Sequence, residues 1–351
     1  MKLHEKYISR CIKLSKNGFG TTRPNPSVGS VIVNDNIIIG EGYTSPYGDN
    51  HAEVNAIESV KDKSLLKKAT IYVSLEPCSH QGKTPPCSNF IVDSGIKNVV
   101  VGCLDDNSLV SGRGIKFMKD NGCKVVVGVL ENECKESNKR FLTFHNKKRP
   151  YIILKWAETK DGFIDKLRDE DSLKEPNWIS NTYSQQIVHQ WRSEEHAIMV
   201  GTNTVIQDNP KLNVRNWSGK NPIRVVLDNS MRIPINSYVF DGSIETIVFT
   251  SSTSLFNYEK KNLSVEYIDY SKNVPQQICD ILYKKNIQSI IIEGGAQTIR
   301  GFVNSDLWDE ARIFIGDVQF EKGLKAPEIE GLTKRVVNID TDILKIVTPV
   351  I

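Results

Sequence analysis

The stretch that decides the fold of this chain opens with His51-Ala52-Glu53-Val54-Asn55-Ala56 and closes with Glu76-Pro77-Cys78-Ser79-His80-Gln81-Gly82-Lys83-Thr84-Pro85-Pro86-Cys87. One histidine and two cysteines give Zn²⁺ three ligands and leave its fourth tetrahedral position to water. The metal lowers the pKa of that water toward neutrality. Glu53 is then placed to carry protons from the water to a ring nitrogen and a leaving amine. The stretch predicts a zinc-dependent deaminase of a pyrimidine-like ring, with His51, Cys78 and Cys87 as metal ligands and Glu53 as the catalytic residue.

The spacing of the two cysteines narrows this prediction. Eight residues separate Cys78 from Cys87, whereas the usual deaminase signature has two, which disfavours a generic cytidine deaminase. Pro85-Pro86 directly precedes a predicted helix start at Cys87, where the helix dipole favours a thiolate. Two alternatives remain open. His80 would close a four-ligand structural zinc site, but Glu53 would then have no role; ordinary buried thiols would explain neither His51 nor the paired prolines.

Length and composition bound the class of protein. A chain of 351 residues exceeds what one compact core usually serves, so we expect two domains. A net charge of +3 is too small to indicate a nucleic-acid partner. Seven cysteines, an odd number, do not indicate a disulfide framework. The N-terminus has no apolar signal region and no apolar run is long enough for a bilayer, so we expect a cytoplasmic protein without a membrane partner.

Strands and helices alternate in the first part of the chain. We expect helices at residues 3–14, 51–60, 114–121 and 131–144, and strands at 28–33, 37–43, 70–75, 98–103 and 124–127, the first two strands forming a hairpin across Asn34-Asp35-Asn36. This order predicts an α/β fold with a three-layer α/β/α domain over residues 1–146. The polar segment 146–150, which ends in a proline, reads as a linker to a second domain over residues 147–351.

Strands and helices are also predicted to alternate in the second part of the chain. We expect strands at residues 151–156, 197–201, 224–228, 246–250 and 289–293, and helices at 182–193 and 274–286. The last of these strands ends in Gly294-Gly295, which opens another helix. Such a junction lets backbone amides approach a phosphate, although a plain tight turn explains most cases. The sequence has no Gly-x-Gly-x-x-Gly fingerprint, which disfavours a standard Rossmann domain.

Several motifs together resemble those of the bifunctional riboflavin-biosynthesis deaminase/reductase family. In the first domain they are Pro24-Asn25-Pro26-Ser27-Val28-Gly29, His51-Ala52-Glu53 and the cysteine loop from Glu76 to Cys87. In the second they are Leu154-Lys155, Asp161-Gly162, Trp178-Ile179-Ser180, His196-Ala197-Ile198, Asp208-Asn209-Pro210, Arg224-Val225-Val226-Leu227-Asp228 and Glu293-Gly294-Gly295. The likeness covers nearly the whole chain in the same domain order.

For the first domain, the resemblance implies a cytidine-deaminase-like fold that hydrolytically removes an amine from a diaminopyrimidinone carrying a phosphoribosylamino group. It implies zinc on His51, Cys78 and Cys87, with Glu53 moving protons. The implied substrate-binding residues are Asn25, Lys83 and Asn107. A lysine in the cysteine loop offers a cation to the phosphate or ribose end, and a solvated surface lysine is the alternative for Lys83.

For the second domain, the resemblance implies a dihydrofolate-reductase-like fold that uses NADPH to reduce the opened ribose to a ribityl chain. We expect Lys155 as the catalytic residue. The implied substrate-binding residues are Arg192, Leu212, Arg215 and Glu293, and the two arginines suit a phosphate. The implied cofactor-binding residues are Glu158, Trp178, Thr204, Asp208, Asn229, Gly295, Ala296, Gln297, Thr298, Ile299, Arg300 and Gly301. The alternatives are a core tryptophan for Trp178 and a solvated acid for Asp208.

Three other functions compete with this expectation. Glu158 stands where the family has a small residue and Pro176 where it has a serine, so one alternative is a deaminase with a catalytically inactive reductase-like domain. The second is a nucleic-acid-editing deaminase, which requires a basic groove with stacking aromatic residues. The third is a non-catalytic scaffold with a closed zinc site. For the bifunctional enzyme we expect phosphorylated pyrimidine ribosylamine substrates and a homo-oligomer, either a dimer or a tetramer.

Overall fold

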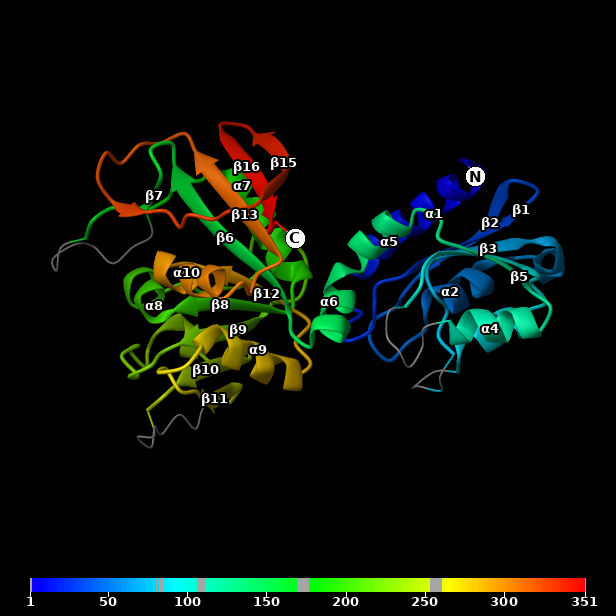
Figure 1. Cartoon of the computed structure of the whole chain (residues 1–351), viewed down its shortest axis with the longest axis horizontal. Helices are drawn as coiled ribbons and strands as arrows, with labels where there is room; N and C mark the ends of the chain where they lie inside the picture. The colour runs from blue at the N-terminus through cyan, green and yellow to red at the C-terminus, as the bar shows by residue number, and fades with distance from the viewer. Residues whose placement is uncertain are drawn as a thin grey trace. The chain divides into compact units, whose positions relative to one another are not determined.

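The computed structural model describes residues 2–79, 81, 85–105, 112–168, 177–252 and 261–350. The chain divides into two compact units, Met1–Lys148 and Arg149–Ile351 (Figure 1). The division lies inside the polar segment that the sequence marks as a linker. Among the residues that the structure describes, no helix has both the length and the apolar character needed to cross a bilayer.

The first unit is built on a five-stranded sheet in the order β2-β1-β3-β4-β5. Strand β1 pairs antiparallel with β2 and β3, whereas β3, β4 and β5 run parallel. Asp35 and Asn36 both have positive φ angles, 49° and 63°, which suits the tight two-residue turn of the β1–β2 hairpin. The strands are β1 (Gly29–Asn34), β2 (Ile37–Tyr43), β3 (Thr70–Leu75), β4 (Asn98–Cys103) and β5 (Lys124–Val127).

Helices cover both faces of this sheet and complete three layers. Helices α1 and α5 pack together on one face, and α2, α3 and α4 pack on the other (Figure 1). Apolar side chains such as Ile32, Ile71 and Val101 fill the interior, where they are fully buried. The helices are α1 (Lys2–Ser15), α2 (Ala52–Ser59), α3 (Cys87–Asp93), α4 (Arg113–Asp120), α5 (Glu131–Ser137) and α6 (Lys139–Lys147), with 3₁₀ turns at Lys16–Gly18 and Lys63–Lys68.

The single helix predicted over residues 131–144 is wrong, because two helices meet at Asn138. The backbone of Asn138 leaves the helical region, with φ −106° and ψ 16°. Its buried side chain donates a hydrogen bond from Nδ2 to the carbonyl oxygen of Cys134. Asparagine side chains compete in this way with the helical hydrogen-bonding pattern, so α5 ends here and α6 begins.

The second unit is built on a nine-stranded sheet in the order β11-β10-β9-β8-β12-β6-β13-β16-β15. The seven strands from β11 to β13 are parallel, and β16 and β15 extend the sheet antiparallel. The strands are β6 (Tyr151–Thr159), β8 (Ala197–Gly201), β9 (Ile223–Leu227), β10 (Thr246–Thr250), β11 (Leu263–Tyr267), β12 (Ser289–Glu293), β13 (Glu310–Gly316), β15 (Leu332–Ile339) and β16 (Asp342–Thr348). Strands β7 (Phe163–Asp165) and β14 (Leu324–Lys325) form a separate pair.

Two apolar layers lie on opposite faces of this sheet. Side chains that alternate along β6 divide between them: Ile152 and Leu154 belong to the layer of α9 and α10, while Tyr151 and Ile153 pack with Trp191 of α7. The helices are α7 (Thr182–Glu194), α8 (Thr202–Asp208), α9 (Val274–Lys284) and α10 (Ala296–Asn304), with a 3₁₀ turn at Tyr238–Phe240. Strands β8, β12 and β6 are adjacent and parallel, so their carboxyl ends meet at one edge of the sheet. Ligands bind at this edge in open α/β sheets.

Candidate active sites

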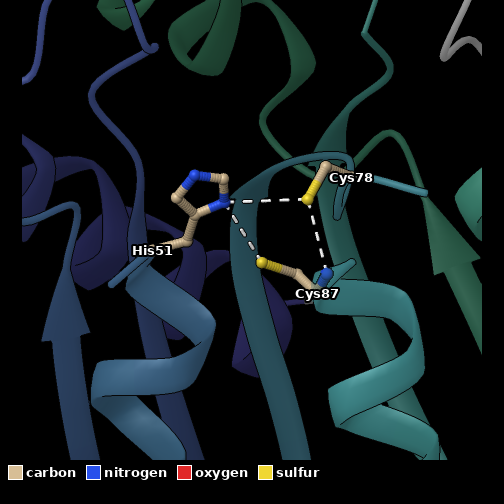
Figure 2. Close-up of side chains that lie close together, drawn as sticks. All are labelled: His51, Cys78 and Cys87. Carbon is tan, nitrogen blue, oxygen red and sulfur yellow. Dashed lines mark hydrogen bonds between the residues drawn. The ribbon is translucent and has the colours of Figure 1, made fainter. Parts of the chain in front are cut away.

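The first unit brings His51, Cys78 and Cys87 together. His51 precedes the first residue of α2, Cys87 is the first residue of α3, and Cys78 follows the end of β3 (Figure 2). The His51 Nδ1 atom lies 3.2 Å from Cys87 Sγ and 3.6 Å from Cys78 Sγ. All three ligand atoms lie within 4.8 Å of one another. Two helix starts and a strand end thus converge on one point.

This cluster fits a zinc ion. Tetrahedral zinc with ordinary Zn–N and Zn–S bonds separates its nitrogen and sulfur ligands by about 3.6 Å. The Cys87 thiol, His51 and the backbone N–H of Cys87, 3.3 Å from Cys78 Sγ, lower the pKa of Cys78, which favours the thiolate that binds a metal. His80, the fourth ligand of the structural-zinc alternative, lies outside the described residues, as do Lys83 and Asn107.

Two polar side chains lie beside the cluster. Glu53, in the first turn of α2, is 4% exposed. Burial, reinforced by the nearby Cys78 and opposed by His51, raises the pKa of Glu53 to about 7. Asn25 places its Nδ2 atom 3.5 Å from His51 Nε2. A buried carboxyl with a pKa near neutrality suits a group that accepts and returns a proton.

A second carboxylate, Glu76, was not expected from the sequence to have a role. It is 4% exposed and accepts hydrogen bonds from the backbone N–H groups of Asp105 (3.4 Å), Gly112 (3.0 Å), Gly114 (3.1 Å) and Ile115 (3.4 Å). Glu76 therefore joins the end of β3, two residues before Cys78, to the end of β4 and the start of α4. Backbone amides have no side-chain signature, so the sequence does not indicate these contacts.

The second unit contains a cavity of about 830 Å³ at the carboxyl edge of its sheet. Charged side chains of both signs line it, together with aromatic and backbone groups. Of the residues expected at a reductase site, those that line the cavity are Lys155, Trp178, Arg192, Thr204, Asp208, Leu212, Arg215, Glu293 and Gly295. Trp178 is 58% exposed, so the alternative of a core tryptophan is wrong.

An ionic cluster lies on the cavity wall. Lys155 and Glu293 are register partners on the adjacent strands β6 and β12. Arg192 donates to both carboxylate oxygens of Glu293, at 3.2 Å from Nε and 2.7 Å from Nη2. Burial raises the pKa of Glu293, but Arg192 and Lys155 outweigh it and lower that pKa to about 2. Burial lowers the pKa of Lys155, which Glu293 opposes. A lysine of this kind gives up its proton more readily than a solvated one.

The remaining wall brings together residues from distant segments. Arg168 donates to Asp208 at 3.1 Å and also pairs with Asp165, so the alternative of a solvated acid for Asp208 is wrong. The backbone N–H of Gly295 donates to Thr204 Oγ1 at 3.1 Å. Gly294 has φ +97°, and a Cβ atom there would lie 2.8 Å from the same oxygen. Gly294 is thus needed both for its positive φ and for the close approach to Thr204, whereas a Cβ atom at Gly295 would make an ordinary contact of 3.5 Å with that oxygen.

The other residues expected to bind the cofactor are not among the described residues that line the cavity. They lie elsewhere in the second unit. The Glu158 carboxylate accepts a hydrogen bond from the Trp156 indole at 2.8 Å. Ile299 is fully buried in the apolar core, and Arg300 donates to the carbonyl oxygen of Lys325. Asn229 interacts with Ser251, Ala296 is buried, Gln297 is exposed, Thr298 lies close to Gly201, and Gly301 lies near Pro275.

Comparison with known families defines the class of protein. Residues 1–103 match the zinc-binding region of the cytidine and deoxycytidylate deaminases, and residues 150–320 match the RibD C-terminal domain. With the His/Cys cluster in the first match and the charged cavity in the second, the chain is a two-domain enzyme that joins a zinc-binding deaminase domain to a reductase domain.

Individual relatives define the family. The chain is 36% identical to the riboflavin biosynthesis protein RibD of Aquifex aeolicus, covering 93% of this chain and 91% of that one. A diaminohydroxyphosphoribosylaminopyrimidine deaminase/5-amino-6-(5-phosphoribosylamino)uracil reductase of Thermotoga maritima has a similar structure, with 36% identity, 99% coverage of both chains and a TM-score of 0.88. RibD of Acinetobacter baumannii gives 30% identity, coverage of 100% and 99%, and the same TM-score. The chain belongs to the family of the riboflavin biosynthesis protein RibD.

Family membership confirms several expectations. The α/β fold class, the cytidine-deaminase-like first domain, the reductase second domain and a bifunctional enzyme of riboflavin biosynthesis are all confirmed. Zinc and NADPH are confirmed as the cofactors of this kind of enzyme. The matches favour this function over a nucleic-acid-editing deaminase and over a zinc scaffold. Of the two residues that suggested an inactive second domain, Glu158 has its carboxylate hydrogen-bonded to the Trp156 indole, and Pro176 lies outside the described residues.

Proposed function

We propose that this chain catalyses two consecutive steps. The first hydrolytically deaminates a diaminopyrimidinone ribosylamino phosphate, and the second reduces its ribosyl group to ribityl with NADPH. One observation carries this proposal: a chain that aligns over 99% of the Thermotoga maritima deaminase/reductase also brings His51, Cys78 and Cys87 within 4.8 Å of one another. The name of that relative describes the same two reactions.

In the first unit, His51, Cys78 and Cys87 would hold Zn²⁺. The bound ion would lower the pKa of a water molecule and so supply a nucleophile at neutral pH. Glu53 accepts a proton from the water at its carboxylate and delivers it to the ring nitrogen. It then takes the remaining proton from the hydroxyl group now bonded to the ring carbon and transfers this proton to the departing amine, as the carbonyl forms and the carbon–nitrogen bond breaks. The net change replaces an exocyclic amine by a carbonyl oxygen and releases ammonia. Asn25, Lys83 and Asn107 are the proposed contacts to this substrate.

In the second unit, bound NADPH supplies a hydride. Lys155 is the proposed proton donor to the sugar oxygen, since its ammonium is buried at the cavity wall and Glu293 is its register partner on the adjacent strand. Arg192 and Arg215 are the proposed phosphate contacts, with Leu212 against the sugar. Trp178, Thr204, Asp208 and Gly295 line the proposed cofactor region, with the start of α10 toward its pyrophosphate. We propose that the other implied cofactor residues contribute to NADPH binding through backbone groups or after a rearrangement. These residues are Glu158, Asn229 and those of the segment 296–301.

We further propose that the protein acts in the cytoplasm, on phosphorylated pyrimidine ribosylamines, as a homo-oligomer. A biosynthetic enzyme with two sites on one chain raises the local concentration of its intermediate near the second site. Size-exclusion chromatography with light scattering tests the oligomeric state, and a monomer at micromolar concentration would contradict that part of the proposal.

The two activities are tested separately on one chain. Given the deaminated substrate directly, the zinc-loaded protein should oxidise NADPH. Glu53→Gln should retain that oxidation but release no ammonia from the earlier substrate, whereas Lys155→Met should release ammonia without oxidising NADPH. Each variant thereby controls for the folding of the other unit. A wild-type protein that fails to oxidise NADPH with the deaminated substrate would overturn the reductase half of the proposal.

A further inference from the structure

His189 lies behind the cavity wall of the second unit rather than on it. The residue is on α7, one turn before Arg192, and is 3% exposed. Its Nδ1 atom lies 3.4 Å from the backbone nitrogen of Arg215. Because a backbone N–H only donates, Nδ1 must be the acceptor, so the ring is neutral and carries its proton on Nε2. One imidazole therefore joins helix α7 to the segment that contains Arg215.

The segment that ends at Arg215 has little regular structure to hold it. No helix or strand covers residues 209–222, all of which the structure describes. Leu212 adopts φ +50°, a conformation that costs a residue with a side chain roughly 1–2 kcal/mol. Such a backbone persists only where its surroundings fix it. The hydrogen bond from Arg215 to His189 is one of the contacts that does so.

Arg192 and Arg215 are linked through the same neighbour. Arg192 Nη1 donates to the carbonyl oxygen of Asn213, and Arg215 Nη1 donates to its side-chain oxygen, both at 3.4 Å. Arg192 is paired with Glu293, whereas no carboxylate among the described residues forms an ion pair with Arg215. Burial and the neighbouring Arg192 lower the pKa of Arg215, as expected for two cations that share a site for an anion.

The charges around His189 favour its neutral form. Burial, Arg192 and Arg215 lower the pKa of His189 to about 4, with Glu293 and a hydrogen bond to the backbone of Asn213 opposing. The acceptor lone pair on Nδ1 is therefore available at neutral pH.

We propose that His189 is a positioning residue of the reductase site: its Nδ1 holds the backbone of Arg215 so that the guanidinium groups of Arg215 and Arg192 bind one phosphate of the substrate. This inference rests on the proposed reductase function. His189 itself does not touch the substrate, so its effect is on phosphate affinity rather than on hydride transfer.

A pair of variants separates this role from general packing. In His189→Asn the side-chain oxygen takes the place of Nδ1, whereas in His189→Gln the polar group reaches the position of Nε2 instead. Gln186→Ala, an exposed change on the same helix, is the matched control. We expect His189→Gln to raise the KM for the phosphorylated substrate about tenfold with kcat within about twofold. We expect His189→Asn and Gln186→Ala to stay within about threefold of the wild type.

The same substrate without its phosphate gives the decisive comparison. Its KM should be the same in all four proteins. Equal effects of the two His189 variants, or an equal rise in KM for both substrates, would overturn the inference. If His189→Gln abolishes cooperative unfolding of the second unit, His189→Asn alone decides, and a tenfold rise in its KM overturns the inference.

Binding of ribose 5-phosphate, measured by calorimetry, keeps the inference distinct from the proposed function. Its Kd should rise about tenfold in His189→Gln and remain near the wild-type value in His189→Asn. That pattern in a protein that does not oxidise NADPH would support the positioning role and overturn the reductase function. Unchanged Kd values in a protein that oxidises NADPH would overturn the positioning role and support the reductase function.

Discussion

Replacing Glu293 by glutamine tests the electrostatics of the reductase site. The carboxylate is 10% exposed, forms two hydrogen bonds with Arg192 and is the register partner of Lys155. A pKa lowered from 4.5 to about 2 corresponds to about 3 kcal/mol of stability at neutral pH. This agrees with the roughly 3–5 kcal/mol typical for breaking a buried pair. Glu293→Gln should therefore destabilise the second unit by about 3 kcal/mol, and the Tm should fall by about 6–12 °C.

Differential scanning calorimetry at pH 7 measures this change, with the transition of the first unit as an internal reference. Glu266→Gln is the matched control, because Glu266 pairs with Lys285 at 2.7 Å and the two side chains are 27% and 34% exposed; such surface pairs contribute about 0–1 kcal/mol. The folded pKa of Glu293 lies below its ordinary value, so its contribution is complete above pH 4.5 and is lost as the pH falls toward 2. A loss of less than about 1 kcal/mol, or one no larger than that of Glu266→Gln, would refute the reasoning.

Four further outcomes are expected. Glu53→Gln should lower deaminase turnover by about 10²–10⁴ while zinc content stays constant, and loss of zinc in metal analysis would contradict a purely catalytic role. Zinc content and the Tm of the first unit should both fall in Cys87→Ser, and in the wild type treated with a chelator, because the ion would join α2 to α3. An unchanged Tm would show that the metal adds no stability. Glu76→Gln sets an amide donor against two of the four backbone N–H groups and should destabilise the first unit by about 2–3 kcal/mol in urea, so a loss below about 1 kcal/mol would argue against these bonds. The pKa of His189 in the folded protein, about 4, lies below the ordinary value of 6.5, so the contribution of the neutral ring to stability is complete above pH 6.5 and declines as the pH falls toward 4. His189→Asn should therefore show a smaller fall in Tm between pH 6.5 and pH 4 than the wild type, and an equal fall in the two proteins would count against a neutral ring.

The sequence predicts the first unit best where local pattern and chemistry agree. His51, Cys78 and Cys87 are far apart in the chain, yet each marks the start of a helix or the end of a strand, and these ends meet in the sheet. The hairpin is equally local, because Asp35 and Asn36 are residue types that tolerate positive φ. Both features depend on signals within a few residues.

What the sequence did not predict depends on partners far along the chain. Glu76 binds the backbone amides of residues 105, 112, 114 and 115, and His189 binds the backbone amide of Arg215, so these contacts have no characteristic side chain as a partner. Strand β15 is mostly exposed and lacks the alternation that marks a strand, so its existence depends on pairing with β16. The break at Asn138 similarly depends on where one side chain folds back.

The strand order of the second unit determines when it can fold during synthesis. Strand β6 is the first strand of that unit to leave the ribosome, but its neighbours β12 and β13 are among the last. Until residues 289–316 emerge, both edges of β6 have unpaired amides and its apolar side chains, such as Ile153, lack their packing partners. The sheet of the first unit, in contrast, is complete by Val127. The deaminase half can thus fold on the nascent chain, whereas the reductase half must wait and is the half that needs protection from aggregation.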